Sequence, residues 1–189
     1  WKGRRFTSAP SFYRGDNAIF SKYPIENRRT IFLNVPYGEY DPVPVGKDFS
    51  QHPKNMQCCE IYVGGTKLNA CNMHGLWELS GGDTPERLKM SEIIVQEVGN
   101  KRKVILAGDF NLRPNTQTVQ NIEKHLANVF KDQLRTTFNL KRKDLKKFPG
   151  YASTVVDMIF TSKDVSILSR GSPNVDVSDH MPLVVEFSV

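Results

Sequence analysis

Hydrophobic residues come in short runs separated by polar segments rich in Pro and Gly, a pattern that favours strands over long helices. The clearest run, Val104–Asp109, is rich in Val, Ile and Leu and predicts a buried strand that ends in a carboxylate. Gly64-Gly65 predicts the turn of a hairpin. The runs together predict strands at residues 17–22, 29–34, 56–63, 67–73, 104–109, 155–161, 166–169 and 183–187.

Two helices are predicted from the residues at their ends. Asp83-Thr84-Pro85-Glu86 supplies cap candidates, a proline at the first helical position and an acid in the first turn, and Gly99 ends this helix. A second helix opens at Asn115 or Thr116 and runs to about Leu126. Irregular loops are predicted between the elements, at residues 36–55 and 139–150.

The composition is that of an ordinary globular chain, with 39% hydrophobic and 24% charged residues in 189. No apolar run approaches the roughly 20 residues that a membrane span needs, so we expect no transmembrane segment. No repeat or linker divides the chain, and we expect one domain over residues 1–189. Strands with two helices between them predict layered sheets covered by helices.

The net charge of +6 is unevenly distributed along the chain. Basic tracts at residues 2–5, 101–103 and 141–147 together carry more positive charge than the whole chain, so the remainder is acidic. Local basic tracts on an acidic body suit a polyanionic partner such as nucleic acid. A set of solvated loop lysines is the alternative.

The cysteines predict neither a disulfide framework nor a zinc site, because their count is odd and two of them are adjacent: Cys58, Cys59 and Cys71. We expect all three to be reduced, which is consistent with the cytoplasm. No secretory signal is visible. The chain begins with Trp1 rather than Met, so the native N-terminus is not determined.

Polar groups follow two of the buried runs directly. Asp109 and Asn111 are two positions apart, so in a strand they project to the same side as the chain leaves the core. Asp179 and His180 precede the apolar run at 183–187. Two carboxylates and a histidine at the ends of buried strands are what metal-assisted phosphate chemistry requires.

Further candidates lie in or beside other strands. Asp157 is a lone carboxylate in an apolar strand and must be paired, ligated or protonated, and His180 is its natural partner. His74 stands just past a strand, although a single histidine is weak evidence by itself. Asp16-Asn17, before the first strand, is a weaker candidate. His52 and His125 are interpreted as ordinary residues.

Four motifs in this order resemble those of the endonuclease/exonuclease/phosphatase superfamily, which has the deoxyribonuclease I-like fold. They are Asn72-x-His74, Gly108-Asp-Phe-Asn111, Val156-Asp-Met-Ile-Phe160 and Ser178-Asp-His-x-Pro182. Residues 16–25 also look like that family's Gly-Asn-Ala-Ile-Leu-Ser strand, and the resemblance extends from about residue 12 to the end. It implies an α/β (α+β) fold, a two-sheet β-sandwich flanked by helices, with a magnesium-dependent phosphoesterase site at one end.

The resemblance also implies roles for individual residues. Asp109 and Asn111 would orient the attacking water and hold the scissile phosphate. His180, held by Asp157, would be the general base or a donor in the transition state. His74 would donate to a phosphoryl oxygen. These roles agree with the chemistry of histidine, which titrates near neutrality and is oriented by a buried aspartate.

The resemblance assigns the metal to Asp179 and Asp109 and substrate contacts to Asn17 and Asn72. Arg113, which follows the metal-site strand directly, is expected to contact the nucleic-acid backbone, as is the loop at 141–147. Mg²⁺, with Mn²⁺ as a possible substitute, needs only one or two carboxylates besides water and phosphate oxygens. The ion neutralises charge on the phosphate during in-line displacement.

One departure from the family's pattern concerns the start of the chain. The family opens with a strand ending in Asn, a helix, and a strand ending in Gln-Glu whose glutamate is a principal metal ligand. No such segment precedes Gly15. The chain therefore resembles a member without its opening β-α-β segment. We expect weakened metal binding and an exposed sheet edge that invites self-association.

Three functions remain open at this stage. The leading one is a magnesium-dependent nuclease or phosphodiesterase acting on nucleic acid, which the basic tracts favour. The second is a phosphomonoesterase or a hydrolase of phospholipid or inositol-phosphate head groups. The third is an inactive fragment or binding module that lacks the ligand glutamate. Trp77 could stack on a base or a ring, or simply pack, so it does not distinguish them.

Overall fold

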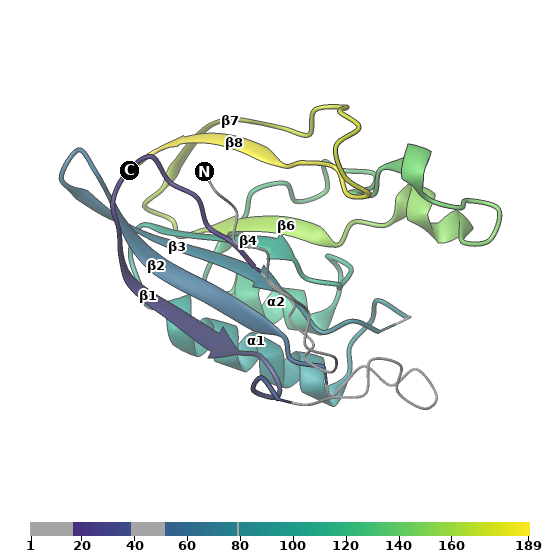
Figure 1. Cartoon of the computed structure of the whole chain (residues 1–189), viewed down its shortest axis with the longest axis horizontal. Coiled ribbons are helices and arrows are strands. Elements are labelled where there is room, and N and C mark those ends of the chain that lie inside the picture. Colours follow the sequence, from purple (N-terminus) through teal and green to yellow (C-terminus); the bar gives the residue numbers. More distant parts are fainter. Residues whose placement is uncertain (1–16, 39–51, 79) are drawn as a thin grey trace, which may run out of the picture.

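A six-stranded mixed sheet forms the centre of the molecule (Figure 1). The computed structural model describes residues 17–38, 52–78 and 80–189. The strands of this sheet are β1 (Ile25–Phe32), β2 (Asn55–Val63), β3 (Thr66–His74), β4 (Val104–Asp109), β5 (Ala127–Asn128) and β6 (Asp157–Thr161). They lie in the order β1-β2-β3-β4-β6-β5, with β3 and β4 parallel and the other neighbours antiparallel.

Two helices, α1 (Pro85–Val98) and α2 (Gln117–Glu123), cover one face of this sheet (Figure 1). As predicted, each has a threonine cap: Thr84 accepts from the backbone N–H of Arg87, and Thr116 from that of Val119. The apolar face of α1 packs on alternate residues of β4, so that Val104 and Leu106 lie in the same buried cluster as Met90 and Ile94. Neither helix is long and apolar enough to cross a bilayer.

A second sheet covers the opposite face. Its strands, β7 (Ser166–Gly171) and β8 (Val184–Ser188), are antiparallel and lie above the large sheet in Figure 1. Ile167 and Val185 pack against a buried cluster that contains Phe130 and Ile159. The layers are therefore two sheets with helices on one outer face, which confirms the β-sandwich that the resemblance implied.

The strand predicted at residues 17–22 is wrong, because these residues form no sheet ladder. Side-chain hydrogen bonds fix this segment instead. The Asn17 amide donates to the backbone oxygen of Asn55 (2.8 Å), and the Asn72 amide donates to that of Ala18 (3.0 Å). The predicted loops also differ in part. Residues 39–51 lie outside the described residues, and the basic loop predicted at 139–150 contains a 3₁₀ helix, Leu140–Arg142, and the start of another, Pro149–Ser153.

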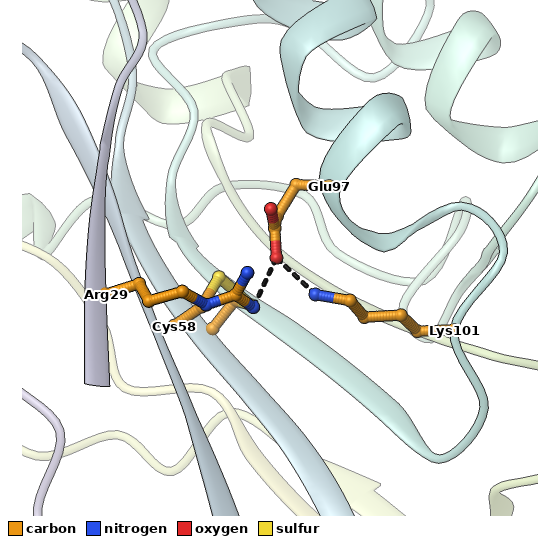
Figure 2. Close-up of a disulfide and its surroundings, with 5 residues drawn as sticks. Arg29, Cys58, Glu97 and Lys101 are labelled. Atoms are coloured by element: carbon orange, nitrogen blue, oxygen red, sulfur yellow. Dashed lines mark hydrogen bonds and ion pairs between the residues drawn. A yellow bond between two sulfur atoms is a disulfide. The ribbon is translucent and has the colours of Figure 1, made fainter. Parts of the chain in front are cut away.

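The prediction that all the cysteines are reduced is wrong for two of them. Cys58 and Cys71 are directly opposite in the β2–β3 hairpin, with Cα atoms 4.2 Å apart, and form a disulfide, whereas Cys59 is buried and free. Strand pairing, rather than spacing in the sequence, brings the two sulfur atoms together. Figure 2 shows Glu97 of α1 beside this disulfide, where it accepts from Arg29 of β1 and from Lys101.

Candidate active site

Three candidate residues form a row across neighbouring strands because of the sheet register. The β3–β4 pairing aligns His74 with Asp109, and the β4–β6 pairing aligns Asp109 with Asp157. His74 and Asp109 end their strands, and Asp157 begins its antiparallel strand, so all three stand at the same end of the sheet. The sequence predicted three separate strands for these residues, with Asp157 inside its strand rather than at its start, and the sheet register brings the three side chains together.

His180 joins this row from the segment before β8. Its ring Nδ1 lies 2.8 Å from a carboxylate oxygen of Asp157, the partner that the sequence suggested. The neighbouring backbone is fixed by the N–H of Met181, which donates to the oxygen of Thr137 (2.7 Å). The ring of Phe138 packs edge-on against His180, with centroids 4.8 Å apart. The imidazole is thus held by a hydrogen bond and by packing.

Asp109, Asp157 and His180 form a compact cluster of potential ligands, whose atoms all lie within 4.8 Å of one another. Burial, together with the charge of Asp157, raises the pKa of Asp109 to about 6. Burial alone would lower the pKa of His180, but the hydrogen bond and charge of Asp157, with the charges of Asp109 and Asp179, raise it. The cluster therefore favours a protonated His180 and leaves the charge of Asp109 incompletely compensated.

The donor set fits a hard divalent cation. Such an ion needs only one or two carboxylates in addition to water and phosphate oxygens, and Asp109 and Asp157 supply them. Asp109 is the better placed, because His180 already holds Asp157. The negative charge of Asp109, which burial disfavours, is what a cation would stabilise.

Asp179, the expected metal ligand, is not part of this cluster. Its carboxylate accepts from the ammonium group of Lys143 at 2.7 Å, and this bond lowers the pKa of Asp179. Lys143 lies over the rings of Phe138 and Tyr151, with its Nζ 4.8 and 5.2 Å from their centroids. The metal-binding role that the resemblance implied for Asp179 stays a prediction, and the structure pairs this carboxylate with Lys143.

His74 is paired with a residue that the sequence analysis missed, Lys54. The Nζ atom of Lys54 lies 3.1 Å from Nε2 of His74, and the same Nε2 lies 3.9 Å from an oxygen of Asp109. Burial and the charge of Lys54 lower the pKa of His74 to about 4, so His74 is neutral at pH 7. Lys54 is only 6% exposed, and burial lowers its pKa too. In the sequence, a lysine directly before a strand gave no indication that it would be buried beside a histidine of the site.

Asn111 faces the backbone of a neighbouring loop. Its side-chain amide donates to the oxygen of Gly75 (3.1 Å), and its backbone N–H donates to the Asp109 carboxylate (2.8 Å). Gly75 is required there, because a Cβ atom would lie 2.3 Å from the backbone oxygen of Phe110. Asn111 therefore orients Asp109 and closes the loop that follows His74.

The expected substrate contacts are spread around the site. The side-chain amides of Asn17 and Asn72 donate the hydrogen bonds that fix residues 17–22. Asp16, the other half of the weaker candidate pair, lies outside the described residues. Arg113 is exposed and lines a cavity of about 510 Å³ that also touches Asp157.

A second residue that the sequence analysis missed is Arg87 of α1, which is 1% exposed. Its guanidinium donates to the backbone oxygens of Leu76 (2.9 Å), Gly82 (2.6 Å) and Asn111 (2.8 Å). These oxygens belong to the loops that follow β3 and β4. Arg87 thus ties together the two loops next to His74 and Asp109, although the helical pattern gave no reason to single it out.

A sequence model of the Endonuclease/Exonuclease/phosphatase family matches residues 2–180. The chain belongs to this family. Family members are phosphoesterases and generally use a divalent metal ion, in agreement with the acidic cluster that includes His180. A search of curated proteins found no match.

Solved structures of the family share the fold. A mannosyl-6-phosphatase from Bacteroides thetaiotaomicron is 17% identical, with a TM-score of 0.65 over 89% of this chain and 68% of that one. The human nocturnin catalytic domain with bound sulfate is 16% identical, with a TM-score of 0.61 over 88% of this chain and 60% of that one. D. rerio TDP2 with a single-stranded DNA product is 19% identical, with a TM-score of 0.62 over 87% of this chain and 68% of that one. The fold is therefore deoxyribonuclease I-like, and the chain spans about two thirds of the length of these structures.

Proposed function

We propose that this family member is a magnesium-dependent phosphodiesterase that hydrolyses nucleic acid. The observation that carries the proposal is the cluster of Asp109, Asp157 and His180 at one end of the sheet. Basic residues 141–147 support a polyanionic substrate, because Lys143 of this segment contacts Asp179, the neighbour of His180. TDP2, a structural neighbour, is described with a single-stranded DNA product.

We assign a separate task to each group of the site. Asp109, positioned by Asn111, would hold the metal ion, which when bound neutralises charge on the phosphoryl oxygens. Asp157 raises the pKa of His180, which favours the protonated ring and therefore donation to a phosphoryl or leaving oxygen over action as the base. The raised pKa of His180 thereby favours one of the two roles that the family resemblance left open.

The test is a substrate panel measured with Mg²⁺, with Mn²⁺ and with a chelator. The panel contains a single-stranded oligonucleotide, a small phosphodiester, a phosphomonoester and an inositol phosphate. We expect metal-dependent cleavage of the oligonucleotide, a loss of at least about 100-fold in D109A, and full activity in E92Q, which changes an exposed acid on α1.

Each other outcome of this panel selects another function. Cleavage of the monoester or the inositol phosphate without cleavage of the oligonucleotide would establish the second function considered for this sequence. Binding of the oligonucleotide with no cleavage of any substrate would establish a binding module. Cleavage that survives both the chelator and D109A would overturn the proposed site.

The disulfide affects the expected cellular location of the protein. The cytoplasmic location suggested by the sequence rested on reduced cysteines, and the bond between Cys58 and Cys71 removes that support, because disulfides persist mainly in oxidising compartments. Self-association through a sheet edge stays a prediction, to be tested by sedimentation.

A further inference from the structure

A series of three aromatic rings leads away from His180 along the basic segment. Phe138 packs against His180, with ring centroids 4.8 Å apart. Tyr151 packs against Phe138 at 4.6 Å, and Phe148 packs against Tyr151 at 5.6 Å. The exposed fraction is 8% for Phe138 and 44% for Phe148. The series therefore connects a histidine of the site with a ring that is open to solvent, on the green segment that projects from the sandwich in Figure 1.

The outer ring is held on a turn that forms without a substrate. The backbone N–H of Phe148 donates to the backbone oxygen of Asp144 (2.9 Å). The carboxylate of Asp144 accepts from the backbone N–H groups of Lys146 and Lys147, both at 3.1 Å. Pro149 follows Phe148 and disfavours a helical backbone at that position. A ring on a preformed turn binds a partner with little loss of conformational entropy.

Two lysines of the basic segment lie over these rings. Lys143 lies over the two inner rings, with its Nζ 4.8 and 5.2 Å from their centroids. Lys147 lies over the outer ring, with its Nζ 5.2 Å from the centroid of Phe148. An exposed aromatic ring beside a cation is the arrangement with which proteins bind single strands, because the ring stacks on a base and the cation attracts the adjoining phosphate.

A base that stacks on a side chain must come from a single strand. In a duplex each base is paired and stacked between its neighbours, so exposing its face costs free energy. A small phosphomonoester or an inositol phosphate beside His180 has no base that could reach Phe148. Two rings separate Phe148 from His180, so the base that it meets belongs to the part of the strand that leaves the site.

We propose that Phe148 is a stacking platform for one base of a single-stranded nucleic acid whose scissile phosphate lies at the cluster of Asp109, Asp157 and His180. Lys147 binds the phosphate next to that base. The inference rests on the proposed phosphodiesterase function and names its substrate as single-stranded. If the rings only packed the basic segment together, Phe148 would contribute to stability and not to binding.

The first experiment measures binding by fluorescence anisotropy in a chelator, with three probes of equal length: a single-stranded oligonucleotide, the same strand without bases, and a duplex. We expect F148A to weaken binding of the single strand about 5- to 100-fold and to leave binding of the other two probes unchanged. The control is Y62A, which removes a 38% exposed ring beside the hairpin turn, at the opposite end of β3 from His74. It should leave all three affinities unchanged.

Two results of this experiment would overturn the inference. One is equal affinity of F148A and the unaltered protein for the single strand. The other is an equal loss with all three probes, because a general loss would not come from stacking on a base. Thermal unfolding of F148A accompanies the measurement, and F148L, which keeps an apolar side chain without an aromatic face, should show the same selective loss.

Salt dependence separates stacking from charge. F148A removes no charge, so the salt slope of single-strand binding should remain that of the unaltered protein, whereas K147Q should lower the slope. A slope that falls in F148A as much as in K147Q would contradict a stacking role for Phe148.

The variant F148W reports stacking directly. The unaltered protein, with Trp1 and Trp77, supplies the baseline fluorescence. We expect the single strand to quench the added tryptophan and the strand without bases to leave it unquenched. No added quenching by the single strand would overturn the inference.

These binding measurements distinguish the inference from the proposed function, because neither needs cleavage. Selective binding of the single strand through Phe148, without cleavage of any substrate, would refute the proposed function alone. Cleavage of the oligonucleotide with the same KM in F148A as in the unaltered protein would refute the inference alone. If both are correct, F148A raises KM and changes kcat little.

Discussion

At the scale of single residues, Asp109 combines a functional position with a cost in stability. Its pKa is about 6 in the fold, above the ordinary value of 3.8, because the carboxylate is buried beside Asp157. A raised carboxyl pKa gives a contribution to stability that is fully present below the ordinary pKa and is lost as the pH rises through about 6. The charged form at pH 8 therefore destabilises the fold when no cation is bound.

The substitution D109N tests this cost. We expect it to raise the free energy of unfolding by about 2 kcal/mol at pH 8 in a chelator, and the gain to shrink as the pH falls below 6. Chemical denaturation at several pH values measures the effect, with E92Q as the control. A D109N variant that is less stable than the unaltered protein at pH 8 would contradict this account.

His180 provides the second prediction at this scale. Its pKa is raised by Asp157, so D157N should lower it. If protonated His180 is the donor, activity falls as the pH rises through its pKa, and D157N should move that fall to lower pH. A proton NMR titration of His180 and a pH–rate profile test the two statements separately. An unchanged His180 pKa in D157N would mean that other charges control it.

At the scale of elements, α1 supports the site through one buried side chain. Arg87 satisfies three backbone oxygens in the loops after β3 and β4. We expect R87M to cost about 3–5 kcal/mol of stability, because it leaves buried carbonyl groups without donors, and R87K to recover only part of it, since lysine lacks the planar fork.

Denaturant unfolding measures the Arg87 effect. R102M is the matched control: Arg102 bonds the carboxylate of Asp164, as Arg87 bonds that of Glu78 (3.3 Å), but the Arg102 side chain is 84% exposed. Exposed ion pairs contribute at most about 1 kcal/mol, so R102M should change stability little. Equal losses in the two variants would argue against a special role for Arg87.

The disulfide in the β2–β3 hairpin predicts which cysteines can be alkylated. Alkylation of the unfolded, unreduced protein should modify Cys59 alone, and reduction should expose all three thiols of the chain. Replacing both Cys58 and Cys71 by serine should cost about 2 kcal/mol, since the bond closes a short loop that the hairpin already restrains. Mass spectrometry after alkylation counts the thiols, and three modified cysteines without reduction would exclude the disulfide.

At the scale of the whole molecule, the basic tracts differ in their surroundings. Residues 101–103 precede β4, at the end of the strand opposite Asp109, and Lys101 and Arg102 are paired with Glu97 and Asp164. In the tract at 141–147, Lys143 is paired with Asp179, the neighbour of His180, and Arg142 with Asp176. The two tracts therefore differ in position: the first lies at the far end of β4, and the second reaches the site through Lys143.

This difference predicts unequal effects on oligonucleotide binding. We expect the double variant K146Q/K147Q to weaken binding several-fold and to lessen its dependence on salt, because each phosphate contact adds to the salt slope. Neutralising Lys101 and Arg102 should have little effect. Fluorescence anisotropy at several salt concentrations compares the two. Equal effects would indicate a non-specific attraction to net charge.

Much of the fold was predictable because its signals are local. Val104–Asp109, the β2–β3 hairpin and the threonine caps follow from residues adjacent in the chain. The strand expected at 17–22 failed because its apolar residues resemble a strand while distant asparagines hold the backbone in place. That residues 1–189 form one domain stays a prediction.

The sequence by itself determined the family, the strand end that carries Asp109, the strand that contains Asp157, and the pairing of Asp157 with His180. These features depend on short motifs and on the need of a buried charge for a partner. Only the tertiary structure decided that Lys54 contacts His74, that Arg87 is buried, that Lys143 pairs with Asp179 and that Cys58 bonds Cys71. Those contacts depend on sheet register and loop packing, which bring together residues whose separation along the chain gives no indication of their distance in space.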